Sequence, residues 1–254
     1  MTIAIIVDLL GTVVMIGVAL AIGERFPNPT TLLLAAVAGT FAVAGILGLY
    51  TGLSVGRMGV VAPVTGVLAA VLPVVVGLVS QGWPGPAVAI GIALALVAVV
   101  LVSASASSDA TERRSGIEYG LLGGIGLGFF NVAVGAFPEH LVAWPLVVIK
   151  VFSLMPIALI VVLGRRDWRI PAAILPIVVL GAFADLAGNG LYILATQAGR
   201  RDVAAMLSSL YPVTTVVLAV FLLHERVTRS HLVGIVTAGI GVALIALGST
   251  SPAL

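Results

Sequence analysis

Nine long apolar runs, separated by short polar breaks, make up most of this chain and limit what it can fold into. As a helix rising about 1.5 Å per residue, each run is long enough to cross, or nearly cross, the ~30 Å hydrocarbon core of a bilayer. The pattern therefore predicts an all-α polytopic membrane protein with about nine spans. The runs are Thr2–Gly23, Thr31–Leu53, Val60–Val79, Pro86–Ser103, Ile117–Phe137, Leu141–Leu163, Pro171–Thr196, Val203–Leu223 and His231–Gly248.

Charged residues are too scarce to cover the surface of a soluble domain. They form 9% of the 254 residues, while 61% are hydrophobic, and a soluble domain usually carries about 25% charge. The small basic excess comes from arginines in the breaks, so we expect a lipid bilayer as partner and no nucleic acid. The chain has no cysteine, which excludes disulfides and thiol catalysis.

Nothing in the sequence resembles the site of a membrane-embedded enzyme. The three histidines, His140, His224 and His231, all lie at the ends of runs and form no cluster with metal-ligand spacing. A phosphate-binding Gly-Lys motif is also missing, which argues against an ATP-driven pump. We therefore expect no enzymatic activity, no cofactor and no metal.

The longest break is rich in serine and charge, and it divides the chain into two similar halves. We expect residues 1–107 to form a first transmembrane repeat of four spans, residues 108–116 a linker, and residues 117–254 a second repeat of five spans. Residues 56–75, GRMGVVAPVTGVLAAVLPVV, parallel residues 199–217, GRRDVAAMLSSLYPVTTVV. Internal repeats of this kind predict two inverted repeats with binding sites at their interface.

The second half resembles a known family. Residues 208–247, SSLYPVTTVVLAVFLLHERVTRSHLVGIVTAGIGVALIAL, are similar to the last two helices of EamA-type members of the drug/metabolite transporter superfamily. Residues 181–199, GAFADLAGNGLYILATQAG, are similar to the preceding helix in bacterial relatives. The resemblance implies a ten-helix transporter of small organic solutes, built from two five-helix inverted repeats.

The chain departs from the family pattern in two respects. His224 stands where the family has a glycine before the glutamate of the turn, here Glu225. With four spans before the linker and five after it, the family's first helix is absent. We expect either a further helix encoded upstream of Met1, which is the simpler account, or a nine-helix form.

Three ionisable residues lie inside apolar runs, where a charge is costly unless it faces a partner or a cavity. Lys150 and Asp185 fall on consecutive antiparallel runs at similar depths, so a direct or water-bridged pair is expected. Asp8 occupies in the first half roughly the place of Lys150 in the second. Two interpretations stay open: a structural ion pair that fixes helix packing, or a substrate-binding charge with Asp185 or Asp8 coupling transport to protons.

Uncharged polar residues inside the runs are further candidates for substrate binding. Asn189 follows Asp185 by four residues and shares its helix face, and Tyr192 extends that face. Small polar residues also join helices in membranes by hydrogen bonds, and we favour that role for Asn131 and binding for Asn189. The remaining candidates are Ser208 and Tyr211, next to Pro212.

Glycines recur at four-residue spacing at Gly120, Gly124 and Gly128. Such spacing allows two helices to approach closely. It serves either a homodimer or packing within the chain, and we favour the latter.

Together, these features predict a secondary transporter in a bacterial inner membrane. It would move an amino acid, metabolite or drug-like compound by alternating access, in the direction of export and coupled to protons. The alternative is a non-transporting membrane subunit or a partner of a lipid flippase.

Overall fold

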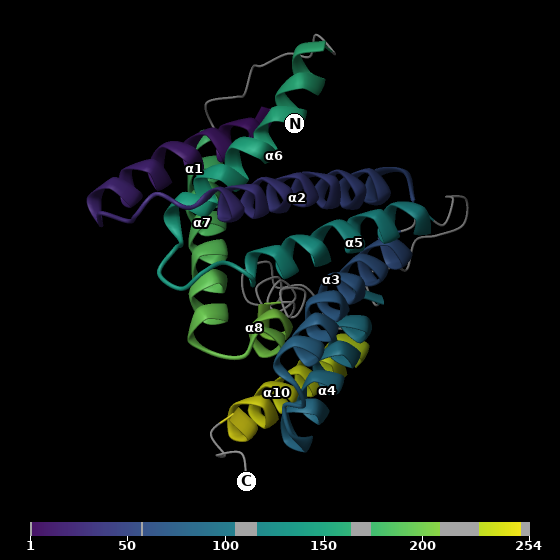
Figure 1. Ribbon diagram of the computed structural model, residues 1–254. Helices are drawn as coiled ribbons and strands as arrows, with labels where there is room; N and C mark the ends of the chain where they lie inside the picture. The colour runs from purple at the N-terminus through teal and green to yellow at the C-terminus, as the bar shows by residue number, and fades with distance from the viewer. Residues whose placement is uncertain (1, 57, 105–115, 164–173, 209–228, 250–254) are drawn as a thin grey trace. The chain divides into compact units, whose positions relative to one another are not determined.

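The computed structural model describes residues 2–56, 58–104, 116–163, 174–208 and 229–249, and its regular structure there is helical. Prolines, glycines and polar residues occupy most of the breaks between helices, and Figure 1 shows the helices in chain order from purple to yellow. The helices are α1 (Thr2–Ala21), α2 (Pro29–Val55), α3 (Met58–Gln81), α4 (Pro86–Ala104), α5 (Ile117–Val134), α6 (Ala143–Leu163), α7 (Leu175–Ala198), α8 (Arg201–Ser208) and α10 (Arg229–Ser249).

Among the described residues, five helices are long and apolar enough to cross a membrane: α1, α2, α3, α5 and α7. Three shorter apolar stretches lie in α4, α6 and α10. Eight of the nine predicted runs thus coincide with a helix to within a few residues. For the remaining run, Val203–Leu223, the structure describes only its start, in α8, and residues 209–223 lie outside the described part. Most of the expected linker, residues 108–115, lies outside it as well.

The chain forms two compact units, and each combines segments from before and after the expected linker. The first unit comprises Met1–Val43 and Ala133–Ala198, and the second comprises Ala44–Val132 and Gly199–Leu254. Helices α2 and α5 each continue from one unit into the other.

In the first unit, α1 packs along α6 and against α7. Apolar side chains such as Leu146, Val161 and Ile193 are almost fully buried there. The start of α2 approaches α6 so closely that a Cβ built on Gly39 would lie 2.6 Å from the carbonyl oxygen of Ile149. The charged residues described below lie within this packing.

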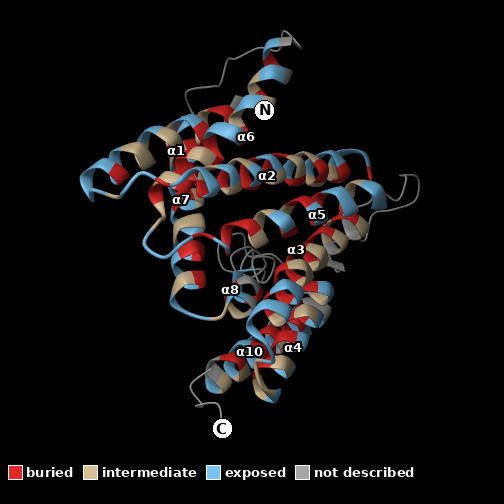
Figure 2. Ribbon diagram, in the orientation of Figure 1, coloured by how far each residue is buried: buried red, intermediate tan, exposed pale blue. Residues whose placement is uncertain are grey.

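In the second unit, α3, α4, α8 and α10 enclose an apolar core, and buried residues lie along the facing sides of α4 and α10 (Figure 2). Alanine and glycine allow the α4 and α10 backbones to touch. A Cβ built on Gly91 would lie 2.7 Å from the Gly241 carbonyl oxygen, and one built on Gly241 would lie 2.8 Å from the Gly91 carbonyl oxygen. The two glycines therefore make a reciprocal contact.

Three of the glycines of α5, Gly120, Gly124 and Gly128, face α3 in the same unit. A Cβ at Gly124 would lie 2.5 Å from Leu68 Cβ, and a Cβ at Gly128 would lie 2.6 Å from Leu72 Cδ1. Thr65 Oγ1 also donates a hydrogen bond to the Gly120 carbonyl oxygen at 3.1 Å. The glycine spacing is thus used within the chain, and it carries no argument for the homodimer.

Candidate functional site

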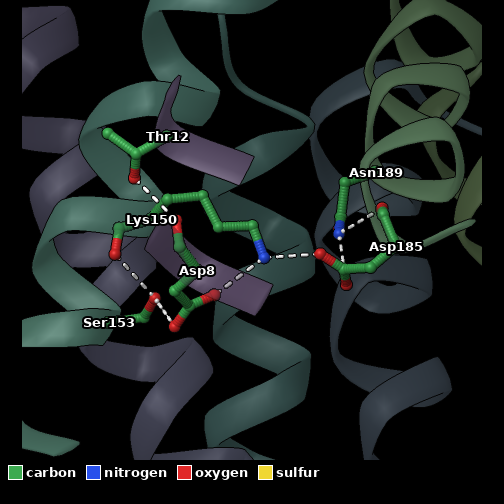
Figure 3. Close-up of polar contacts among 6 residues, drawn as sticks. All are labelled: Asp8, Thr12, Lys150, Ser153, Asp185 and Asn189. Carbon is green, nitrogen blue, oxygen red and sulfur yellow. Dashed lines mark hydrogen bonds and ion pairs between the residues drawn. The ribbon is translucent and has the colours of Figure 1, made fainter. Parts of the chain in front are cut away.

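A cluster of charged side chains is buried among the apolar helices of the first unit. The sequence places Asp8 in the middle of α1, Lys150 in the middle of α6 and Asp185 in the middle of α7. Packing of α1 against α6 and α7 brings the three side chains together (Figure 3). The expected contact between Lys150 and Asp185 is direct, and Asp8 joins it as a third member.

Lys150 donates to both carboxylates. Its Nζ lies 2.9 Å from Asp8 Oδ1 and also forms an ion pair with Asp185 Oδ2. Only 9% of the lysine side chain is exposed. A buried ammonium is tolerated when carboxylates surround it, because their attraction offsets the loss of hydration.

The two carboxylates differ in their surroundings. Asp8 is 11% exposed, and its second oxygen accepts a hydrogen bond from Ser153 Oγ at 2.8 Å. The Asp185 side chain is 39% exposed, and its second oxygen accepts a hydrogen bond from Asn189 Nδ2 at 3.0 Å. Asp8 is therefore enclosed by α1 and α6, whereas Asp185 can be reached from outside the packing of the three helices.

Within the part of the chain that the structure describes, the cluster is not electrically balanced. Two carboxylates face one ammonium, which leaves a net charge of minus one when all three groups are ionised. An uncompensated charge among apolar helices is costly. A proton or another cation at the cluster would remove that cost.

The remaining candidates are divided between the two units. Asn189 adjoins Asp185 as its spacing predicted, and Tyr192 is buried one turn further along α7. Asn131 belongs to the second unit, where its Nδ2 donates to the Ala69 carbonyl oxygen at 3.4 Å, an interhelical bond of the kind we favoured for it. Ser208 is exposed at the end of α8 in the second unit, and Tyr211 lies outside the described residues.

Sequence reasoning missed two residues of the first unit. Ser153 lies three residues after Lys150, so the helical period that linked Asn189 to Asp185 also places Ser153 beside the lysine. Glu24 follows α1 and offered no such signal, because it acts on a helix 118 residues further along the chain.

Glu24 caps the amino-terminal end of α6. Its carboxylate oxygens accept hydrogen bonds from the backbone N–H groups of Val142, Ala143 and Trp144 at 3.1, 3.0 and 2.8 Å. These N–H groups have no partner within a helix that starts there, and a negative charge also favours the helix dipole. The cap joins the end of α1 to the start of α6, the two helices that hold Asp8 and Lys150.

A chain whose described residues form membrane-length apolar helices, with an ion cluster buried among them, is a polytopic membrane protein. Residues 114–247, more than half of the chain, match the EamA-like transporter family. The chain belongs to this family of membrane transporters in the drug/metabolite transporter superfamily, as the sequence resemblance predicted.

A solved structure with the same fold covers almost the whole chain. It is titled "Crystal structure of protein" and is similar to this chain with a TM-score of 0.72 and 19% sequence identity. The alignment covers 99% of this chain and 89% of the other chain. At that level of identity the likeness concerns the fold alone. No curated protein matches the sequence.

Proposed function

We propose that the protein is a secondary transporter that exports a small organic solute by alternating access, with Asp185 as the carboxylate that couples transport to protons. The observation that carries the proposal is the buried cluster of Asp8, Lys150 and Asp185. A structural ion pair needs one carboxylate for one ammonium, but this cluster contains a second carboxylate. The negative charge that remains gives a proton a place to bind.

The coupling role falls to Asp185 rather than Asp8. Both oxygens of Asp8 accept hydrogen bonds from donors with buried side chains, and little of the carboxylate is exposed. The side chain of Asp185 is more exposed, and the residue lies on α7, outside the pair of helices that Asp8 and Lys150 join. A proton can therefore reach Asp185 without breaking the contact between α1 and α6.

The inverted-repeat arrangement is part of the same proposal, with residues 1–107 and 117–254 as the repeats. Two contacts support it. Asp8 and Lys150, which hold similar places in the two halves, bind each other. The last helices of the two halves, α4 and α10, also pack against each other. Equivalent elements meet in this way across a two-fold axis.

The likeness of residues 181–199 to bacterial relatives supports a place in the bacterial inner membrane. Amino acids, other metabolites and cationic drugs all remain candidate solutes.

The test is solute flux in proteoliposomes. The purified protein is reconstituted with a pH-sensitive dye inside, and a panel of labelled amino acids, monoamines and cationic dyes is supplied with and without a proton gradient. We expect at least one solute to move faster with the gradient, and its movement to displace protons. Asp185→Asn should abolish the gradient's effect while the variant remains folded. Absence of flux across the whole panel would favour the non-transporting subunit.

A further inference from the structure

We propose that the solute carries a protonated amino group that binds Asp185. In the absence of solute, the Lys150 ammonium occupies this position, and the solute displaces it. This inference rests on the proposed transport function, because it names the chemical class of the solute. The site would then select small ammonium compounds and reject anions.

The first argument is the chemistry that Asp185 already recognises. Its two oxygens accept hydrogen bonds from the Lys150 ammonium and from the Asn189 amide. A primary ammonium on a solute has the same charge and the same three N–H donors as a lysine side chain. An anion approaching the cluster would instead meet a net negative charge.

The second argument is that Lys150 has a second partner when it leaves Asp185. Asp8 holds the ammonium at 2.9 Å and is itself held by Ser153. Lys150 and Ser153 share α6, and the Glu24 cap joins α6 to the end of α1. The lysine therefore remains paired within α1 and α6 while Asp185, on α7, changes partner.

The third argument is the charge balance. Lys150 alone leaves the cluster at minus one, and an added ammonium brings it to zero. Binding would thus remove the cost of a net charge among apolar helices. Because the added ammonium would take the place that a proton otherwise takes, solute and proton would compete for Asp185.

The test uses n-butylammonium, which reproduces the lysine side chain, and the neutral n-butanol as control. The full chain in detergent is titrated by calorimetry. Asp8→Asn combined with Lys150→Met keeps the net charge of the cluster at minus one but removes the lysine ammonium that competes with the solute for Asp185. If lysine vacates Asp185 in fewer than about a tenth of the molecules, this double variant should bind n-butylammonium at least about tenfold more tightly than the wild type. Adding Asp185→Asn should abolish binding.

A second measurement needs no variant. Lys150 is the single lysine of the chain, so labelling lysine with ¹⁵N gives one side-chain ammonium resonance in the wild type. We expect n-butylammonium to shift this resonance to saturation, because the lysine loses Asp185, and n-butanol to leave it in place. In Asp185→Asn the resonance should be shifted from the start and should not respond further.

Equal affinities in the wild type and the double variant, or binding that survives Asp185→Asn, would overturn the inference. A lysine resonance that does not shift at saturating n-butylammonium would also overturn the inference. Proton-coupled flux of a solute without an amino group would overturn the inference and leave the proposed transport function standing. Binding of n-butylammonium at Asp185 without flux of any solute would overturn the transport function alone.

Discussion

Glu24 and Trp144, 120 residues apart, bind each other twice: the Glu24 carboxylate accepts from the Trp144 backbone N–H at 2.8 Å, and the Glu24 carbonyl oxygen accepts from the indole N–H at 3.0 Å. The indole ring also meets Phe26 edge to face, with ring centroids 5.1 Å apart. This contact fixes the loop after α1 to the first turn of α6. It holds the two helices in register at one end, and the ion pair between Asp8 and Lys150 holds them further along.

Removing the Glu24 carboxylate should destabilise this joint. We expect Glu24→Ala to lower the free energy of unfolding by about 1–2 kcal/mol, because three N–H groups at the start of α6 lose a charged acceptor. Thermal unfolding in detergent measures the loss. Glu139→Ala is the matched control, since that carboxylate is in an exposed loop residue and should change stability by less than about 0.5 kcal/mol. Equal losses in the two variants would contradict the capping role.

Charge balance predicts an unusual rescue within the ion cluster. Lys150→Met leaves two carboxylates without a counter-charge and should cost about 3–5 kcal/mol of stability. Adding Asp8→Asn removes one of these carboxylates, so the double variant should be more stable than Lys150→Met alone. Chemical unfolding of the wild type, both single variants and the double variant forms the cycle. Additive losses would show that the two residues do not share one electrostatic unit.

Asp185→Asn should leave stability nearly unchanged. The remaining Asp8 and Lys150 form a balanced pair that Ser153 still supports. We expect a change within about 1 kcal/mol, because the loss of one contact with Lys150 is offset by removal of the cluster's extra negative charge. Ser153→Ala, by contrast, should cost about 1.5–3 kcal/mol, since it removes a donor from a buried carboxylate. A larger loss for Asp185→Asn than for Ser153→Ala would reverse the roles assigned to the two aspartates.

Gly124 of α5 should not tolerate a methyl group. Gly124→Ala places a Cβ within 2.5 Å of Leu68 Cβ, so α5 and α3 must separate, at a cost of about 1–3 kcal/mol. Gly17→Ala in α1 is the control, because no atom lies within 4 Å of its added Cβ. That variant should be neutral or more stable by up to about 1 kcal/mol, since alanine favours a helix. The unfolding temperature should therefore fall for Gly124→Ala and stay the same or rise for Gly17→Ala.

The reciprocal contact of Gly91 and Gly241 predicts coupled losses. Each single alanine variant brings a Cβ onto the other residue's carbonyl oxygen and should cost about 1–3 kcal/mol. Once one methyl group has pushed α4 and α10 apart, the second meets less resistance. The double variant should therefore lose less stability than the sum of the single variants.

The helices could be predicted closely because the length of an apolar run depends on the local sequence alone. The pair of Lys150 and Asp185 could also be predicted, because consecutive antiparallel helices bring equal depths together. The contacts of Asp8 and Glu24 with α6 could not. Both act on α6 from more than 100 residues away, and only the choice of neighbouring helices determines such contacts. Asn131 and Ser208 are uncharged polar residues inside apolar runs, as Asn189 is, yet they belong to the other unit.

The ion pair between Asp8 and Lys150 also constrains how the protein is made. The ribosome adds roughly 5–20 residues per second, so the 142 residues that separate the two partners delay the lysine by about 7 to 28 seconds. During this time α1 is without the ammonium group that pairs with its carboxylate in the folded protein. The ion pair can therefore form only after α6 has been synthesised.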